Sequence, residues 1–246
     1  MTFDMHFHIA GRLVAEDHHR QPPPLGCVVS RSVTENPNCL RFAASTNNEC
    51  ALFADPQDEH WDKLLELVDS GTALAYQHIE RLGKQSLHRF DPLLTVSERI
   101  GSPVVLHISR HDKSRFDASE ASFCLRRIVE RFPDLSVVIS HIGGENFREA
   151  LRWGNAHPNI YLDTSRATET AQRAGFSNAS EVLRSASEAI GADRLVYGSD
   201  LTWPYGYDRD AVSAMSVIED SFNAMDVRNI LRHNARKLLE SSRASA

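Results

Sequence analysis

Short apolar runs typical of buried strands alternate with helical runs through most of this 246-residue chain. The continuous apolar segments 103–107 and 135–141 are typical of strands buried on both faces, and residues 121–132 between them carry apolar side chains at helical spacing. Repeated strand–helix units predict a parallel sheet covered by helices. At this length the leading architecture is a (β/α)₈ TIM-like barrel, and an open doubly wound sheet is the alternative. No GxGxxG turn follows the first strand, which disfavours a nucleotide-binding doubly wound fold.

The same patterns give an expected order of elements and one expected domain. Strands are expected at 2–9, 26–30, 49–54, 72–78, 103–107, 135–141, 160–165 and 194–200, and helices at 61–68, 91–100, 121–132, 146–153, 181–190, 211–222 and 226–239. Residues 10–48 fit the scheme poorly, because 36–48 shows no clear helical pattern. The first third of the barrel is therefore expected to be shortened or irregular. We expect a single barrel domain over 1–240 and a disordered tail at 241–246.

The composition narrows the class of protein. The chain is 41% hydrophobic and carries a net charge of −6, so nothing indicates a nucleic-acid-binding surface. No apolar run reaches the length of a membrane span, and the N-terminus shows no signal peptide. The four cysteines form no C-x-x-C pair, which favours reduced structural thiols in a cytoplasmic protein. A small molecule is the expected partner, and a homo-oligomer remains open.

The first expected strand carries two histidines that can share a metal ion. With a period of two, Asp4, His6 and His8 lie on one face of the strand 2–9, and the other face holds Phe3, Met5, Phe7 and Ile9. Two imidazoles one residue apart on one face lie about 7 Å apart along the strand and can converge on one ion. Taken alone, His-x-His is equally explained by two histidines that bond to backbone groups.

Three later strands also end in residues of ligand type, His107, His141 and Asp200. Each alone has an ordinary explanation as a core histidine or a helix cap. In a parallel barrel, however, the carboxyl ends of the strands converge on one pocket. Imidazoles with one carboxylate suit Zn²⁺, with Mn²⁺ or Fe²⁺ as alternatives. Such an ion would lower the pKa of a bound water; Asp200 could bind the ion and accept a proton, and a histidine off the metal could move protons.

At this point the chain resembles the amidohydrolase superfamily, in particular its branch related to aminocarboxymuconate-semialdehyde decarboxylase. The resemblance rests on short segments in a specific order: Asp4-x-His6-x-His8, Phe90-Asp-Pro-Leu-Leu94, Pro103-Val-Val-Leu-His107, His141-Ile-Gly-Gly144, Gly198-Ser-Asp200 and the closing Asn234-Ala-Arg-Lys-Leu. It implies a (β/α)₈ barrel with one divalent metal. His6, His8, His107 and Asp200 would be the ligands, and His141 would be the catalytic histidine.

The resemblance leaves the reaction open between two chemistries. Members hydrolyse C–O or C–N bonds, often in lactones, or decarboxylate aromatic or dienoic acids. We favour a hydrolase of a small carboxylated or cyclic ester or amide; a decarboxylase and a degenerate, non-catalytic barrel are the alternatives. Binuclear relatives use a carboxylated lysine, and no lysine ends the strand 72–78, which argues for one metal. Nucleases of the TatD type share the first motif, and Glu80 is close to their middle-strand glutamate.

Other residues near the expected mouth of the barrel are candidates for binding substrate. Arg110 and Arg166 follow strand ends and could hold a substrate carboxylate. Trp203 follows Asp200 and could form a pocket wall. His78 ends a strand and could reach the pocket.

Overall fold

The strands form one parallel sheet in the computed structural model, which describes residues 2–10, 24–79, 81, 86–109, 116–204 and 207–243. The described residues give nine strands in the order β8-β7-β6-β5-β4-β3-β2-β1-β9. Their bounds are β1 Asp4–Ile9, β2 Gly26–Val29, β3 Glu49–Phe53, β4 Leu74–His78, β5 Val104–His107, β6 Val137–Ile139, β7 Ile160–Asp163, β8 Leu195–Val196 and β9 Thr202–Trp203. Sequential strands are therefore neighbours from β1 to β8, as in a TIM barrel.

The two edges of this sheet meet, because β8 and β9 are consecutive in the chain but lie at opposite ends of the strand order. The segment that joins them runs along β1. Met5 N–H donates to Tyr197 O (2.7 Å), and Ser199 N–H donates to His6 O (3.0 Å). β9 then pairs with the end of β1, with His8 opposite Thr202. These contacts close the barrel, and the expected fold class is confirmed.

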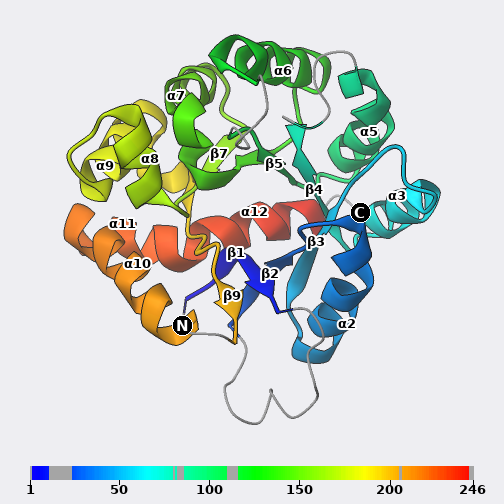
Figure 1. The fold of residues 1–246 in the computed structure, drawn as a ribbon, viewed down its shortest axis with the longest axis horizontal. Coiled ribbons are helices and arrows are strands. Elements are labelled where there is room, and N and C mark those ends of the chain that lie inside the picture. Colours follow the sequence, from blue (N-terminus) through cyan, green and yellow to red (C-terminus); the bar gives the residue numbers. More distant parts are fainter. Residues whose placement is uncertain are drawn as a thin grey trace.

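Helices surround the strands as a ring, and α12 crosses the middle of the view (Figure 1). Their bounds are α2 Asn36–Thr46, α3 Trp61–Asp69, α5 Asp91–Arg99, α6 Ala118–Arg131, α7 Phe147–Ala156, α8 Ala167–Ala174, α9 Ala179–Ile190, α10 Tyr207–Ser221, α11 Ala224–Arg228 and α12 Asn234–Arg243. Short helices are η1 Val33–Glu35, η2 Leu87–Phe90, η3 Ser140–Asn146, η4 Ala192–Arg194 and the π-helical η5 Asn229–His233. Within the described ranges, no helix combines the length and apolarity needed to cross a membrane.

Two apolar clusters fill the molecule. The larger lies between the strands and the ring of helices and includes Leu106 and Ile139, and the smaller includes Val105 and Val138 from the same strands. The smaller cluster also contains Leu238 of α12. Alternate residues of β5 and β6 therefore face inward, and α12 closes the end of the barrel opposite the strand-end histidines.

The first strand departs from the strict alternation that the sequence predicts. The register between β1 and β2 shifts between Asp4 and Phe7, as a β-bulge does. Phe3 and Met5 consequently belong to the inner cluster, whereas Phe7 packs in the outer one. The prediction that all four apolar residues of the strand share one face is therefore wrong. The bulge adds one residue to β1, so the side chains that follow it alternate in the opposite sense.

The prediction of no helix across 36–48 is also wrong. α2 begins at Asn36 with Pro37 in its first turn, buries Cys39, Phe42 and Ala43, and ends at Asn47 in the left-handed conformation. The Asn36 amide exchanges two hydrogen bonds, both 2.9 Å, with the backbone of Phe53 at the end of β3. This contact between distant segments fixes the start of α2. Residues 11–23 lie outside the described ranges.

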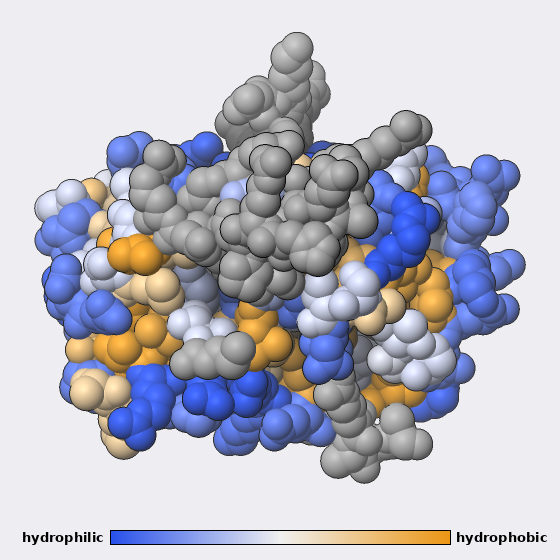
Figure 2. Space-filling view, turned by 90° about the horizontal axis from the view of Figure 1, so that it is seen from below, coloured by the Kyte–Doolittle hydropathy of each residue, from blue (hydrophilic) through white to orange (hydrophobic). Residues whose placement is uncertain are grey.

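Two further differences concern helices. α8 (Ala167–Ala174) forms directly after β7, where no helix was expected, and α12 runs to Arg243, into the expected tail. Figure 2 shows the edge of the molecule, on which hydrophobic residues appear as separate patches among hydrophilic ones. Among described large apolar side chains, Val212 and Met225 are exposed, and isolated residues of this kind need no special explanation.

Candidate metal centre

His6 and His8 reach the carboxyl-terminal mouth of the barrel from β1, and their ring centroids lie 5.1 Å apart. The Asp4 carboxylate fixes the strand beside them. Its Oδ1 accepts N–H bonds from His6 (3.1 Å) and from Ser199 (3.0 Å). Asp4 therefore ties β1 to the Gly198–Asp200 turn and brings the two motifs into contact.

His8 faces the carboxylate of Asp200 with the nitrogen that normally binds metal. Its Nδ1 donates to Val29 O at 2.7 Å, so in the neutral ring the lone pair is on Nε2. That atom lies 2.9 Å from Asp200 Oδ1. Burial lowers the pKa of His8, although Asp200 opposes the shift. A neutral imidazole lone pair and a carboxylate oxygen repel at this distance, so a cation between them would stabilise the arrangement.

His6 is held by Asp163, a residue for which the sequence analysis assigned no function. Nδ1 of His6 lies 2.9 Å from Asp163 Oδ2, and both side chains are buried. Nε2 of His6 makes no hydrogen bond with any described group and lies 3.5 Å from Asp200 Oδ1. Asp163 ends β7 at the same mouth as the predicted ligands. Its position at a strand end was the signal that could have identified it.

The pKa values of this pair follow from their contact. Burial alone would raise the pKa of Asp163, but the hydrogen bond and charge of His6 outweigh burial and lower it to about 2. Burial alone would lower the pKa of His6, but Asp163, with Asp200 and Asp4, raises it. A proton and a metal ion therefore compete for His6, as expected for an imidazole ligand.

His141 lies in η3 with a left-handed backbone (φ 59°), an uncommon conformation for a residue other than glycine. Gly144 completes the turn at φ 56°, and a Cβ there would lie 2.3 Å from Ser109 Oγ. Nδ1 of His141 lies 2.7 Å from Ser165 Oγ, and Thr170 Oγ1 donates to His141 O at 2.9 Å. Burial lowers the pKa of His141 well below its ordinary value. The ring is therefore neutral at neutral pH.

The structure brings His6, His141 and Asp200 together as a group of three possible metal ligands, with their ligand atoms all within 4.8 Å of one another. This grouping differs from the predicted ligand set, which contains His8 and His107 in place of His141. His8 is directly adjacent through Asp200, and the His107 ring lies 4.9 Å from that of His141. Each of the five predicted strand-end residues therefore lies next to at least one of the others at the mouth of the barrel.

His78 also reaches this cluster, as the sequence allowed. It lies opposite His107 in the register of β4 and β5, and the two rings stack at 4.2 Å. Tyr76 Oη lies 3.1 Å from His78 Nε2, and its ring is 5.7 Å from that of His6. Tyr76 was not among the predicted site residues, because its role depends on neighbours from other strands.

The other residues predicted to bind substrate lie in different environments. Arg166 forms an ion pair with Asp200 Oδ2 through its Nε, while 53% of its side chain stays exposed. Trp203 is fully buried and packs on Phe42 in the outer core, with ring centroids 5.4 Å apart. It therefore stabilises the core and does not form an open pocket wall. Arg110 lies outside the described residues, as does Glu80.

Comparison with known proteins places the chain in a family. A family model described as amidohydrolase matches residues 51–240, most of the chain. The chain belongs to the amidohydrolase family. The expectation drawn from the motifs is thus confirmed, and members of this family are enzymes that typically depend on a metal. No curated protein matches the chain in sequence.

Solved structures share the fold at low sequence identity. A proposed 2-pyrone-4,6-dicarboxylic acid hydrolase from Pseudomonas putida is 18% identical, with a TM-score of 0.68 and coverage of 98% of this chain and 97% of that chain. A zinc-bound amidohydrolase from Burkholderia multivorans is 16% identical (TM-score 0.63, coverage 98% and 99%). The 5-carboxyvanillate decarboxylase of Sphingomonas paucimobilis is 14% identical (TM-score 0.62, coverage 92% and 81%). The chain is thus similar in fold to both hydrolases and decarboxylases.

The residues of this amidohydrolase fit a divalent ion. Nε2 of His6 is buried without a hydrogen-bond partner in the described structure, and Nε2 of His8 faces a carboxylate. Each ring donates its other nitrogen proton, to Asp163 and to Val29 O respectively, as metal-bound histidines commonly do. Nitrogen donors with one carboxylate suit Zn²⁺ or a similar ion.

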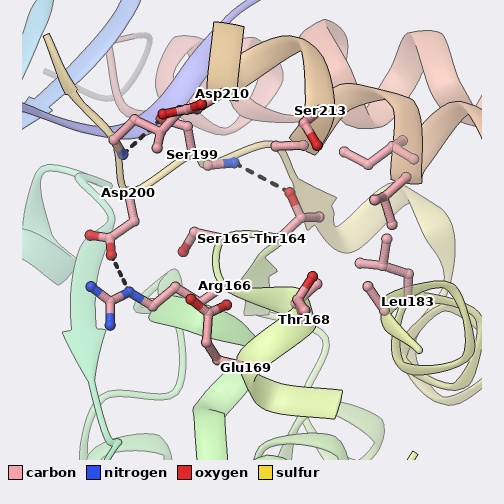
Figure 3. Close-up of a pocket in the computed structure, with 17 residues that line it drawn as sticks. Thr164, Ser165, Arg166, Thr168, Glu169, Leu183, Ser199, Asp200, Asp210 and Ser213 are labelled. Carbon is pink, nitrogen blue, oxygen red and sulfur yellow. Dashed lines mark hydrogen bonds and ion pairs between the residues drawn. The ribbon is translucent and has the colours of Figure 1, made fainter. Parts of the chain in front are cut away.

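A cavity of about 320 Å³ lies beside Asp200 (Figure 3). In Figure 3 the Asp200 carboxylate points to Arg166 at one border of this space. Segments after β7 and β8 line it together with α8, α9 and α10, and its walls include Thr168, Leu183 and Ser213. The cavity has the size of small-molecule sites, and Asp200 belongs both to it and to the histidine cluster.

Proposed function

We propose that this amidohydrolase is a metal-dependent hydrolase that acts on a small carboxylated or cyclic ester or amide, such as a lactone. The observation that carries the proposal is the 2.9 Å approach of His8 Nε2 to Asp200 Oδ1 while His8 Nδ1 is used by Val29 O. In this arrangement His8 Nε2 and Asp200 Oδ1 are suited to bind the same metal ion. A proposed pyrone-dicarboxylate hydrolase shares the fold, and so does a decarboxylase, so the choice of hydrolysis rests on these donors and on Arg166.

In this proposal His6, His8, His107 and Asp200 hold one divalent ion, Zn²⁺ first, with Mn²⁺ or Fe²⁺ as alternatives. When bound, such an ion supplies a Lewis acid and lowers the pKa of the attacking water toward neutrality. The donor atoms are preorganised by groups of the chain itself. Asp163 and Val29 O orient the two imidazoles, and Asp4 fixes the turn that carries Asp200.

His141 is the proposed catalytic histidine. Its Nδ1 is occupied by Ser165, so the neutral ring offers the Nε2 lone pair as a proton acceptor. Because burial keeps the pKa of His141 low, the ring is available as a base at neutral pH and can return the proton to a leaving group. Arg166 is accessible and cationic, so it can hold an anionic group of the substrate. The cavity beside Asp200 can take the rest of a small molecule.

Two measurements test this function. Elemental analysis of the purified protein should give about one divalent metal per chain, and His6→Ala should lower that content. The metal-loaded protein is then assayed with lactones, cyclic amides and unsaturated carboxylic acids in ¹⁸O-labelled water. One solvent oxygen in the product supports hydrolysis. Release of carbon dioxide with no label in the organic product would replace hydrolysis with the decarboxylase alternative, and an absence of both metal and turnover would favour a non-catalytic barrel.

A further inference from the structure

Asp163 occupies the centre of the hydrogen-bond network below the candidate metal centre. It is fully buried, and its two carboxylate oxygens serve different partners. Oδ2 pairs with His6 Nδ1 at 2.9 Å. Oδ1 accepts N–H bonds from His141 (2.9 Å) and Ser165 (3.0 Å) and also the Ser165 hydroxyl. One carboxylate thus contacts a proposed ligand, the backbone of the proposed catalytic histidine and Ser165, which bonds to the ring of that histidine.

These contacts determine where each histidine carries its proton. Because Asp163 is an ionised acceptor, the proton shared with His6 sits on Nδ1, and the lone pair of the neutral ring is on Nε2. The Ser165 hydroxyl donates its proton in the hydrogen bond to Asp163. Its oxygen therefore accepts a hydrogen bond from the Nδ1–H of His141. His141 consequently also keeps its lone pair on Nε2. Both lone pairs then point away from Asp163, toward the mouth of the barrel.

We propose that Asp163 is a positioning residue that sets the tautomers of two histidines, His6 directly and His141 through Ser165. This inference rests on the proposed function, because it assigns Asp163 a role in preparing a metal ligand and a base. Asp163 touches neither substrate nor metal in this role. Gly198 makes the arrangement possible, since a Cβ there would lie only 3.0 Å from His6 Cβ and 3.2 Å from Asp163 Cβ.

The structure predicts that Asp163→Asn changes the tautomer of His6. Three donors converge on Oδ1, so the amide oxygen of asparagine belongs at that position. The amide NH₂ then faces His6 Nδ1 and donates to it. His6 must move its proton to Nε2, which removes the lone pair that binds metal. Ser165→Ala is the matched control, because it interrupts the branch to His141 and leaves the contact between Asp163 and His6 intact.

The test uses metal-free, full-length protein labelled with ¹⁵N-histidine. Because Asp163 raises the pKa of His6 against the effect of burial, spectra are recorded at increasing pH until the His6 ring is neutral. Long-range ¹H–¹⁵N spectra separate the two tautomers, and His6→Gln assigns the His6 signal. Wild-type His6 should be protonated on Nδ1 and should move to the Nε2–H form in Asp163→Asn. Zinc affinity, measured by chelator competition, should fall by about 10- to 100-fold in Asp163→Asn. Ser165→Ala should alter the His141 signal and leave the His6 signal and the zinc affinity unchanged.

The proposal is overturned if wild-type His6 is protonated on Nε2, or if folded Asp163→Asn keeps both the wild-type tautomer and the wild-type zinc affinity. Should Asp163→Asn not fold, as judged by circular dichroism, the wild-type and Ser165→Ala spectra decide the question alone. A wild-type protein that binds none of Zn²⁺, Mn²⁺ and Fe²⁺ would refute the proposed function instead. The tautomers are read in metal-free protein, so the two failures are distinguishable.

Discussion

The imidazole rings of His78 and His107 stack with centroids 4.2 Å apart, at the ends of adjacent strands β4 and β5. His78 is in turn held by the Tyr76 hydroxyl. The stack supports the ring of His107, the proposed ligand, which also lies 4.9 Å from the ring of His141 in an edge-on arrangement.

His107→Ala should lower the bound metal as strongly as His6→Ala, because each removes one proposed donor. His78→Ala removes only the supporting ring, so it should lower metal affinity by about tenfold, a typical cost for a group that orients a ligand. Elemental analysis and chelator competition measure both effects. Full metal content in His107→Ala would mean that His141, and not His107, is the fourth metal ligand. The close grouping of His6, His141 and Asp200 is compatible with that ligand set.

His141→Asn should reduce turnover by at least ~10²-fold, the usual contribution of a positioned base. Its metal content should fall much less than that of His6→Ala. Steady-state kinetics with metal analysis of the same samples measure both quantities. Full activity in the folded variant would remove His141 from the proposed reaction.

Arg166→Gln should raise KM for an anionic substrate by about tenfold or more, because a charge-assisted hydrogen bond contributes about 1.5–3 kcal/mol. Because Arg166 also pairs with Asp200, a proposed ligand, all variants are compared at saturating metal. Arg173→Gln is the control, since Arg173 lies on α8, the helix that begins directly after Arg166, is exposed to a similar extent and pairs with Glu145. Equal effects of the two substitutions would show that Arg166 does not contact substrate.

Asn234→Ala should lower the free energy of unfolding by about 1–3 kcal/mol. The Asn234 amide donates to the carbonyls of Ala192 (2.8 Å) and Leu195 (2.7 Å), so it attaches the start of α12 to β8. Urea unfolding of the two proteins measures the difference. The exposed Arg228→Ala serves as a control and should change stability by less than about 0.5 kcal/mol. A wild-type midpoint for Asn234→Ala would mean that α12 packs without this contact.

The thiols of the folded protein should react very slowly with an aromatic disulfide reagent near pH 8. All four cysteines are buried, and none of them forms a disulfide. Burial raises the pKa of Cys39 and of Cys50 to about 12 and that of Cys27 well above its ordinary value. Thiolate is the reactive form, so reaction should speed up as the pH rises and should reach four thiols only after unfolding. Rapid reaction of a native thiol would contradict this burial.

The sequence predicted the order of strands and helices where the signal is local. The segments 103–107 and 135–141 contain β5 and β6, because continuous apolar β-branched residues favour buried strands. It missed α2, whose start is fixed by the contact between Asn36 and the distant Phe53 backbone. It also missed the bulge in β1, because a change of register is a property of the paired strands.

The sequence by itself determined the barrel and its family, and it placed ligand-type residues at the ends of its strands. Only the tertiary structure decided how those residues meet. It turned Nε2 of His8 toward Asp200, paired Arg166 with the same carboxylate, buried Trp203 in the core and placed Asp163 beneath both His6 and His141. Strand periodicity is encoded by neighbours in the chain, whereas hydrogen-bond partners such as Asp163 and His6 are 157 residues apart and become neighbours only when the barrel closes.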